Sequence, residues 1–280
     1  PHAKVKLTMA KHKRTELILE NAISVLADYH PMTVRQVYYR LVSRQIIDNN
    51  RSQYQAVSNI LVDARKSGAI PWDWVEDRLR KPRHISMWDD LADFAHTAVH
   101  SYRLDVWATQ AGYVECWLEK DALSGVFEQV LADYGITLNV GRGYDGWDSI
   151  HSAAMRFGTG KGTTVLYYGD FDPSGEDMVR SLQERLAFFG CEPEIVKCAL
   201  TLDDVQRYNL PPDFAKKTDT RAAAFIEKWG DMAVELDALP PDVLQTSLKN
   251  EVEKRMDMAA LASVKLQERR DKAELLAKLE

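Results

Sequence analysis

The most informative segment of the chain is Leu166-Tyr167-Tyr168-Gly169-Asp170-Phe171-Asp172-Pro173-Ser174-Gly175. An apolar run ends there in Asp-x-Asp, and Pro-Ser-Gly leads into a segment with helical periodicity. Two carboxylates at the carboxyl end of a buried strand are costly unless a cation holds them. That edge of an open α/β sheet is also where ligands bind. The alternative interpretation is an Asx-type turn with two solvated aspartates.

From Gly112 onward, apolar runs of strand length alternate with segments of helical periodicity. Alternation of this kind predicts a parallel sheet covered by helices. The strands are predicted at 114–118, 136–140, 163–168 and 194–198, and the helices between them at 121–134, 149–157 and 176–189.

The first part of the chain reads differently, as three short helices at 16–29, 33–43 and 52–67. Thr33 and Gln36 match a capping box, which predicts a helix start at Thr33. A basic tail follows at 77–83. This pattern predicts a helix-turn-helix of the winged kind, whose third helix could enter a DNA major groove. Packing alone would also produce three amphipathic helices.

The charge is unevenly distributed along the 280 residues, whose net charge is −6. Residues 1–83 carry 15 Lys and Arg against 8 Asp and Glu, so the rest of the chain is strongly acidic. A basic front and an acidic remainder fit a DNA-binding module joined to a carboxylate-rich catalytic one. Uneven solvated surface charge is the alternative.

Other features bear on the compartment. No apolar run approaches the ~20 residues of a membrane span, and Pro1-His2-Ala3-Lys4 is no signal region. The three cysteines form neither a CxxC pair nor a disulfide framework. We expect a cytoplasmic, nucleoid-associated protein with reduced thiols and no membrane partner.

Acidic residues follow two of the predicted strands. Glu119 follows the first, and Asp170 and Asp172 follow the third. Because these strand ends share one sheet edge, the three carboxylates should come together. Oxygen ligands without His or Cys favour Mg²⁺ or Mn²⁺. Gly141-Arg142-Gly143-Tyr144 falls at the same edge and could approach a phosphate, although such a glycine motif is weak by itself. Glu235 and Asp237 either join this acidic cluster or lie on a helix surface.

Together, Glu119-Lys120, Gly141-x-Gly143-Tyr144 and Asp170-Phe-Asp-Pro-Ser-Gly175 resemble a TOPRIM domain. More narrowly, the chain resembles the topoisomerase VI A subunit and the related meiotic double-strand-break transesterase. In that family a winged helix with the motif Arg-Asp-(Ile/Leu)-(Tyr/Phe)-Tyr precedes TOPRIM, and this chain has Arg35-Gln36-Val37-Tyr38-Tyr39. The likeness continues downstream and covers about 31–250, in the segments Asp219-x-Arg221, Phe225-Ile226-x-Lys228-Trp229-Gly230 and Glu235-Leu-Asp-Ala-Leu239.

The resemblance implies an α/β protein in which a helical winged-helix domain (1–84) precedes a TOPRIM domain with a Rossmann-like parallel sheet (112–247). A connecting helix (85–111) joins the two, and a helical segment (248–280) ends the sequence. Gln36 replaces the family's usual acidic residue, and Ser174 replaces a common tyrosine. The sequence contains no GHKL-type ATPase motif. We therefore expect a compact bacterial or phage relative rather than a true topoisomerase subunit.

The resemblance implies that Tyr39 is the nucleophile and that Glu119, Asp170 and Asp172 hold the metal. Arg35 and Arg40, close in sequence to Tyr39, could favour its phenolate or hold the scissile phosphate. The implied partners are double-stranded DNA and a second copy of the chain, which would supply the metal site to the first copy's tyrosine. A separate ATPase subunit is a further implied partner. The residues expected to contact DNA are Arg65, Arg78, Arg80, Lys81, Arg83 and Arg142.

Other functions remain open from the sequence. With the same fold, a metal-activated water could hydrolyse DNA while Tyr39 only positions it, as in TOPRIM nucleases of plasmid defence. The chain could also be a non-catalytic DNA-binding accessory protein. TOPRIM supports primase-like nucleotidyl transfer as well, but the sequence offers no zinc ribbon to accompany it.

Overall fold

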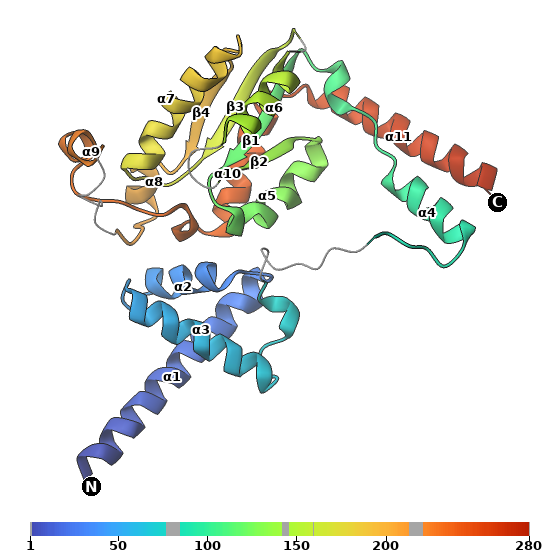
Figure 1. Ribbon diagram of the computed structural model, residues 1–280. Helices are drawn as coiled ribbons and strands as arrows, with labels where there is room; N and C mark the ends of the chain where they lie inside the picture. The colour runs from blue at the N-terminus through green and yellow to red at the C-terminus, as the bar shows by residue number, and fades with distance from the viewer. Residues whose placement is uncertain (1, 77–84, 142–145, 159, 213–220, 280) are drawn as a thin grey trace.

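A four-stranded sheet in which every strand pair is parallel forms the centre of the larger part of the molecule (Figure 1). The computed structural model describes residues 2–76, 85–141, 146–158, 160–212 and 221–279. The strand order is β2-β1-β3-β4. The strands are β1 (Gly112–Leu118), β2 (Thr137–Val140), β3 (Gly162–Tyr168) and β4 (Glu194–Ala199). The predicted mixed α/β class with a parallel sheet is confirmed.

Helices cover both faces of the sheet, because alternate strand residues point to opposite sides. Trp117 and Val165 pack in the core that includes α6 and α7, whereas Leu118 and Tyr168 pack in the core that includes α5 and α10. The helices of this part are α5 (Ser124–Leu131), α6 (Trp147–Phe157), α7 (Pro173–Phe188), α8 (Leu202–Arg207), α9 (Ala222–Trp229), α10 (Pro241–Glu253) and α11 (Met258–Leu279). Short 3₁₀ turns are η4 (Asp121–Leu123), η5 (Ala132–Tyr134) and η6 (Leu236–Ala238).

The register of β1 and β3 positions the candidate site. Leu118 pairs with Tyr168, so both strands end at the same level. The chain continues as Glu119 after β1 and as Gly169-Asp170 after β3, and the Glu119 amide donates to the Tyr168 carbonyl at 2.9 Å. The two carboxylates thus leave neighbouring central strands at the carboxyl edge of the sheet.

The N-terminal part consists of helices packed on one another, seen at the bottom of Figure 1. They are α1 (His2–Tyr29), α2 (Val34–Ser43), α3 (Arg51–Lys66) and the 3₁₀ turn η1 (Trp72–Trp74). The predicted capping box is confirmed, since the Thr33 side chain accepts from the Gln36 amide and the Gln36 side chain accepts from the Thr33 amide. Helix α3 begins one residue earlier than predicted because Asn50 caps it.

The wing of the predicted winged helix stays a prediction. Within residues 2–76 the backbone forms an isolated parallel bridge between Met32 and Val75 but no strand hairpin. The basic tail at 77–84 lies outside the residues that the structure describes.

Helix α4 (Leu91–Ser101) and the 3₁₀ turn η3 (Val106–Thr109) follow, and α4 lies beside α11 at the right of Figure 1. The Tyr102 hydroxyl donates to Asp271 at 3.0 Å, and the Leu104 amide donates to Glu268 at 3.1 Å. Gln110 exchanges hydrogen bonds with the backbone of Asp257. Within the segments predicted as a connecting helix and a helical end, the structure has α4 and α11.

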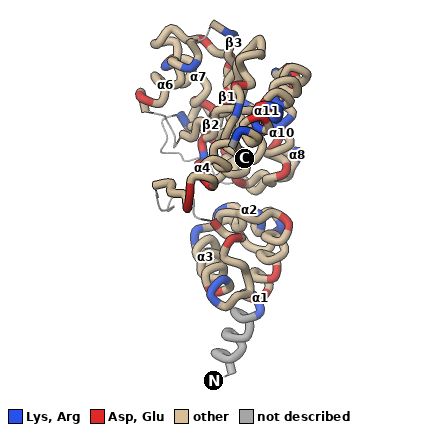
Figure 2. Tube along the Cα trace, turned by 90° about the vertical axis from the view of Figure 1, so that its right-hand side faces the viewer, with Lys and Arg blue, Asp and Glu red and all other residues tan. Residues whose placement is uncertain are grey.

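No helix among the described residues has the length and apolar character to cross a membrane. In the view of Figure 2, basic and acidic positions are interspersed on both the helical part and the sheet part.

Candidate active site

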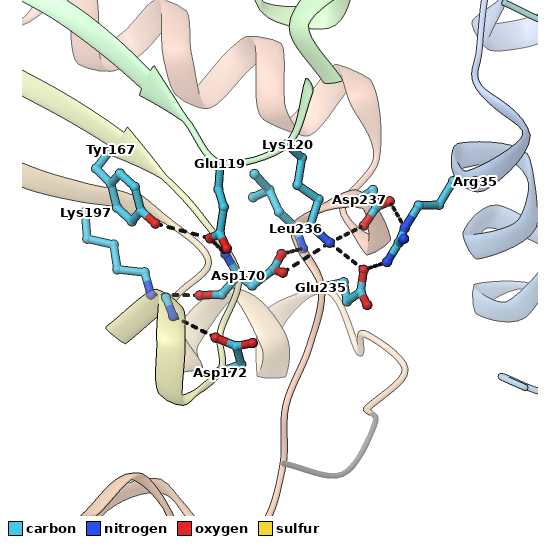
Figure 3. A network of polar contacts seen from close by, with 11 residues as sticks. Arg35, Glu119, Lys120, Tyr167, Asp170, Asp172, Lys197, Glu235, Leu236 and Asp237 are labelled. Carbon is cyan, nitrogen blue, oxygen red and sulfur yellow. Dashed lines mark hydrogen bonds and ion pairs between the residues drawn. The ribbon is translucent and has the colours of Figure 1, made fainter. Parts of the chain in front are cut away.

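Glu119 and Asp170 are in direct contact at the carboxyl edge of the sheet (Figure 3). One carboxylate oxygen of Glu119, Oε2, accepts the Asp170 backbone N–H at 3.0 Å and the Tyr167 hydroxyl at 3.1 Å. These two bonds orient the Glu119 side chain toward the end of β3. The sequence predicts that three carboxylates meet here. The fold brings Glu119 and Asp170 into contact, whereas the Asp172 side chain caps α7.

Asp170 is the most enclosed of the predicted metal ligands, with 9% of its surface exposed. Its Oδ1 accepts the Leu236 amide at 2.8 Å, and its Oδ2 lies 3.1 Å from the Lys120 ammonium. Burial raises the pKa of Asp170 to about 6, and the neighbouring Glu119 charge adds to the rise. Lys120 opposes the shift but does not cancel it, so the charged form of Asp170 is the costly one.

Lys120 lies at the centre of three carboxylates, as Figure 3 shows. Its ammonium pairs with Asp170 Oδ2 at 3.1 Å, with Asp237 Oδ1 at 3.2 Å and with Glu235. We refer to Asp170, Glu235 and Asp237 as the acidic cluster. Asp237 is only 2% exposed, and a buried carboxylate needs a cation beside it. Lys120 thus compensates charge that the protein would otherwise leave buried.

Arg35 reaches the acidic cluster from the other part of the chain. It projects from α2 and pairs with Glu235 and, at 2.7 Å between Nε and Oδ2, with Asp237. The arginine therefore joins the helix that carries Tyr39 to the carboxylates at the sheet edge.

Tyr39 lies beside this junction and is 7% exposed. Tyr39, Arg35 and Glu235 line one pocket. The Arg35 guanidinium carbon lies 5.6 Å from the centre of the Tyr39 ring. Burial raises the pKa of the Tyr39 hydroxyl above its ordinary value, and Asp237 adds to the rise, while Arg35 acts in the opposite direction and is outweighed.

Arg40, the second arginine expected near the phenol, has other contacts. Its guanidinium carbon lies 4.5 Å from the centre of the Tyr29 ring, and its Nη2 lies 3.9 Å from Asp242. Of the two arginines predicted to act on Tyr39, Arg35 is the one for which the structure gives such a contact.

Asp172 begins α7. Its Oδ1 accepts the Gly175 amide at 2.6 Å, which makes it the N-cap of that helix. A side chain at Gly175 would place its Cβ 2.1 Å from the Asp170 carbonyl oxygen, so the turn requires glycine there. Lys197 donates to that same carbonyl at 3.1 Å and to Glu176 at 2.5 Å. Asp172 therefore shapes the turn that presents Asp170.

The donor chemistry of the sheet edge fits a hard cation. Among the described residues, no group of three or more His, Cys, Asp or Glu side chains is arranged to hold a metal ion. The predicted set of Glu119, Asp170 and Asp172 is thus not such a group. Glu119 and Asp170 are in contact through the Asp170 backbone N–H, and Mg²⁺ is commonly held by one or two carboxylates together with substrate phosphate and water. These two residues are the pair that would hold the ion.

The other predicted DNA contacts are only partly placed. Arg65 donates to the Leu61 carbonyl at 3.2 Å, and its guanidinium carbon lies 5.0 Å from the centre of the Trp72 ring. The remaining predicted DNA contacts and one residue of the downstream motif lie outside the described residues, namely Arg78, Arg80, Lys81, Arg83, Arg142 and Asp219.

Sequence reasoning missed some members of this site. It gave no role to Lys120, Tyr167 or Lys197, and it left Glu235 and Asp237 undecided between cluster and surface. In the structure the Lys120 ammonium links both of these acids to Asp170. The position of Lys120 directly after Glu119 was the available signal, because a lysine at a strand end among acids is a natural charge partner.

No protein-family model matches the chain, and no curated protein matches it either. The likeness to topoisomerase VI A-type proteins is therefore an expectation from the sequence motifs alone.

Proposed function

We propose that this chain is a divalent-metal-dependent enzyme that cleaves double-stranded DNA through attack by Tyr39 on a phosphodiester. The observation that carries the proposal is the meeting of Tyr39, Arg35 and Glu235 at one pocket, joined through Arg35 and Lys120 to the carboxylate of Asp170. A tyrosine, a guanidinium and a carboxylate-rich sheet edge are the groups that such a transesterification uses.

In this step the Tyr39 oxygen attacks phosphorus, so a tyrosyl–phosphate bond forms while the bond from phosphorus to one sugar oxygen breaks. The phenolic proton leaves to solvent, and the released sugar oxygen takes up a proton from solvent. Arg35 lies beside Tyr39 and would hold the attacked phosphate by charge-assisted hydrogen bonds. The reaction needs no further co-reactant, because one ester replaces another.

Glu119 and Asp170 would hold the divalent ion, which when bound stabilises the charge that develops on the phosphate oxygens. Tyr167 and the Asp170 amide fix the Glu119 carboxylate for this role, and the Leu236 amide fixes Asp170. A second copy of the chain and an ATPase subunit remain proposals that the family resemblance alone suggests.

Hydrolysis by water is the second candidate, and one observation favours it. Because burial raises the pKa of Tyr39, its phenolate is scarce at neutral pH and the tyrosine is a weak nucleophile. In this alternative, water attacks the phosphodiester at the same sheet edge, and Tyr39 only positions DNA. The cut ends would then carry no protein.

The test is a supercoiled-plasmid assay with Mg²⁺ or Mn²⁺, stopped with SDS and run with and without protease. Wild type is compared with Tyr39→Phe and Glu119→Gln. Tyr208→Phe, which changes a tyrosine at the end of α8, is the matched control. We expect protein-linked breaks that both site variants lose and the control retains.

Protein-free breaks that persist in Tyr39→Phe and vanish in Glu119→Gln would replace the transesterase by the hydrolytic nuclease. If wild type and variants bind DNA but none of them cuts it with either Mg²⁺ or Mn²⁺, both enzymatic proposals are contradicted. The chain would then be a non-catalytic DNA-binding protein.

A further inference from the structure

A pocket of about 350 Å³ opens beside Tyr39, within the size range of small-ligand sites. Its walls come from three separate places in the chain: α2, the start of α3 and the segment before η6. The residues that matter here are Arg35, Tyr39, Asn49, Arg51, Tyr54 and Glu235.

One side of the pocket is aromatic. The rings of Tyr39 and Tyr38 meet edge to face with centres 5.1 Å apart, and those of Tyr38 and Tyr54 do so at 5.3 Å. Tyr38 is buried, and its hydroxyl donates to Asn49 at 2.9 Å, which fixes this row against the loop before α3. Tyr54 is 36% exposed and is therefore the member of the row that is open to a ligand.

The remaining walls are charged. Arg51 is exposed at the first turn of α3, and Arg35 enters from α2. Glu235 is the carboxylate on this wall, and it is already paired with Arg35 and Lys120. Two guanidinium groups beside an exposed aromatic ring are suited to a phosphate joined to a planar base.

We propose that this pocket binds one unpaired nucleotide of the DNA strand, next to the phosphodiester that Tyr39 attacks. The base lies against Tyr54, and its phosphate lies between Arg35 and Arg51. The proposal rests on the proposed function and names its substrate class. A base can enter a concave pocket only after leaving the helical stack, which is least costly where it is already unpaired. The chain therefore prefers gapped or bulged duplexes over intact ones.

The experiment measures binding without cleavage, in Tyr39→Phe protein with EDTA. The probes are a fluorescein-labelled duplex with one unpaired adenine bulge and the same duplex fully paired, compared by anisotropy. We expect about tenfold tighter binding of the bulged duplex. Tyr54→Ala should remove this preference, because loss of one base–aromatic stack changes affinity by about 5- to 150-fold. Tyr54→Phe should keep it, since the ring remains.

Phe188→Ala, which removes a 74% exposed aromatic at the end of α7, is the matched control and should keep the preference. Arg51→Gln is the second variant and should weaken binding of the bulged probe about tenfold. It should also lower the salt slope of that binding by about one. Thermal melts test whether each variant is folded. If Tyr54→Ala does not fold, the binding of Arg51→Gln to the two probes is the test of the pocket.

Equal binding of the two probes by the Tyr39→Phe protein that carries no second substitution would overturn the inference. The inference would also be overturned if folded Tyr54→Ala and Arg51→Gln proteins still bound the bulged duplex more tightly than the paired one. The two proposals fail separately. A bulge preference without plasmid cutting would contradict the proposed function alone, and cutting without any preference would contradict the nucleotide pocket alone.

Discussion

At the scale of single residues, the site depends on one ammonium group, that of Lys120, which pairs with Asp170, Glu235 and Asp237. Glu119 and Asp170 follow strands whose apolar runs are legible in the sequence, and parallel pairing brings such strand ends together. Lys120 contacts Glu235 and Asp237, which lie 115 and 117 residues further along the chain. No local pattern specifies such a contact. The raised pKa of Tyr39 could not be anticipated either, because it follows from burial and from the distant Asp237.

The first prediction concerns the pH dependence of stability in the metal-free protein. The pKa of Asp170 rises from its ordinary 3.8 to about 6 on folding, so the folded state binds more protons than the unfolded state between these pH values. Wild type therefore loses stability as the pH rises through this window. Asp170→Asn removes the charge, and its amide oxygen can still accept the Leu236 N–H.

Relative to wild type, the free energy of unfolding of the variant should therefore increase as the pH rises from 3.8 to 7, by up to about 3 kcal/mol. Urea unfolding in EDTA at pH 4.5 and 7.5 measures this change. A stability difference that is the same at both pH values would refute the explanation.

At the scale of elements, the helices and strands were largely predictable because their signals are local. The capping box at Thr33, the Asp-Pro start of α7 and the apolar run at the end of β3 each fall within a few residues. What the sequence did not reveal is the docking of α2 on η6, which depends on Arg35 and on acids two hundred residues away.

The second prediction concerns the start of α2, the helix that presents Arg35 and Tyr39. Thr33→Ala removes the side-chain oxygen that accepts the Gln36 amide and should cost about 1 kcal/mol of unfolding free energy. Thr33→Ser keeps that oxygen and should lose much less. Urea unfolding of the two variants provides the comparison, and equal losses would show that the lost methyl group rather than the cap is responsible.

At the scale of the whole molecule, one chain brings its own Tyr39 to its own acidic cluster. The family resemblance implies the opposite, a tyrosine and a metal site from different protomers. The ion pairs of Arg35 with Glu235 and Asp237 are contacts within one chain. Neither composition nor periodicity could have distinguished the two arrangements, because both use the same residues.

The third prediction follows from this arrangement. If the site forms within one chain, mixing Tyr39→Phe protein with Glu119→Gln protein should leave plasmid cutting at the level of the separate variants. In a site built from one chain, Tyr39→Phe always lacks the attacking hydroxyl and Glu119→Gln always lacks the carboxylate. Recovery of cutting in the mixture, after time for subunit exchange, would instead establish a site shared between two copies.

The contacts that residues 102–110 make with α11 and with Asp257 just before it also limit when this part of the chain can fold during synthesis. Tyr102, Leu104 and Gln110 bond to residues that follow them by 147 to 169 positions. At about 5–20 residues per second, a ribosome needs on the order of ten to thirty seconds to supply those partners. Until then α4, with Leu91 80% exposed even in the finished fold, has no α11 to lie against. In the nascent chain, the bonds of Tyr102 and Leu104 can therefore form only after α11 has been synthesised.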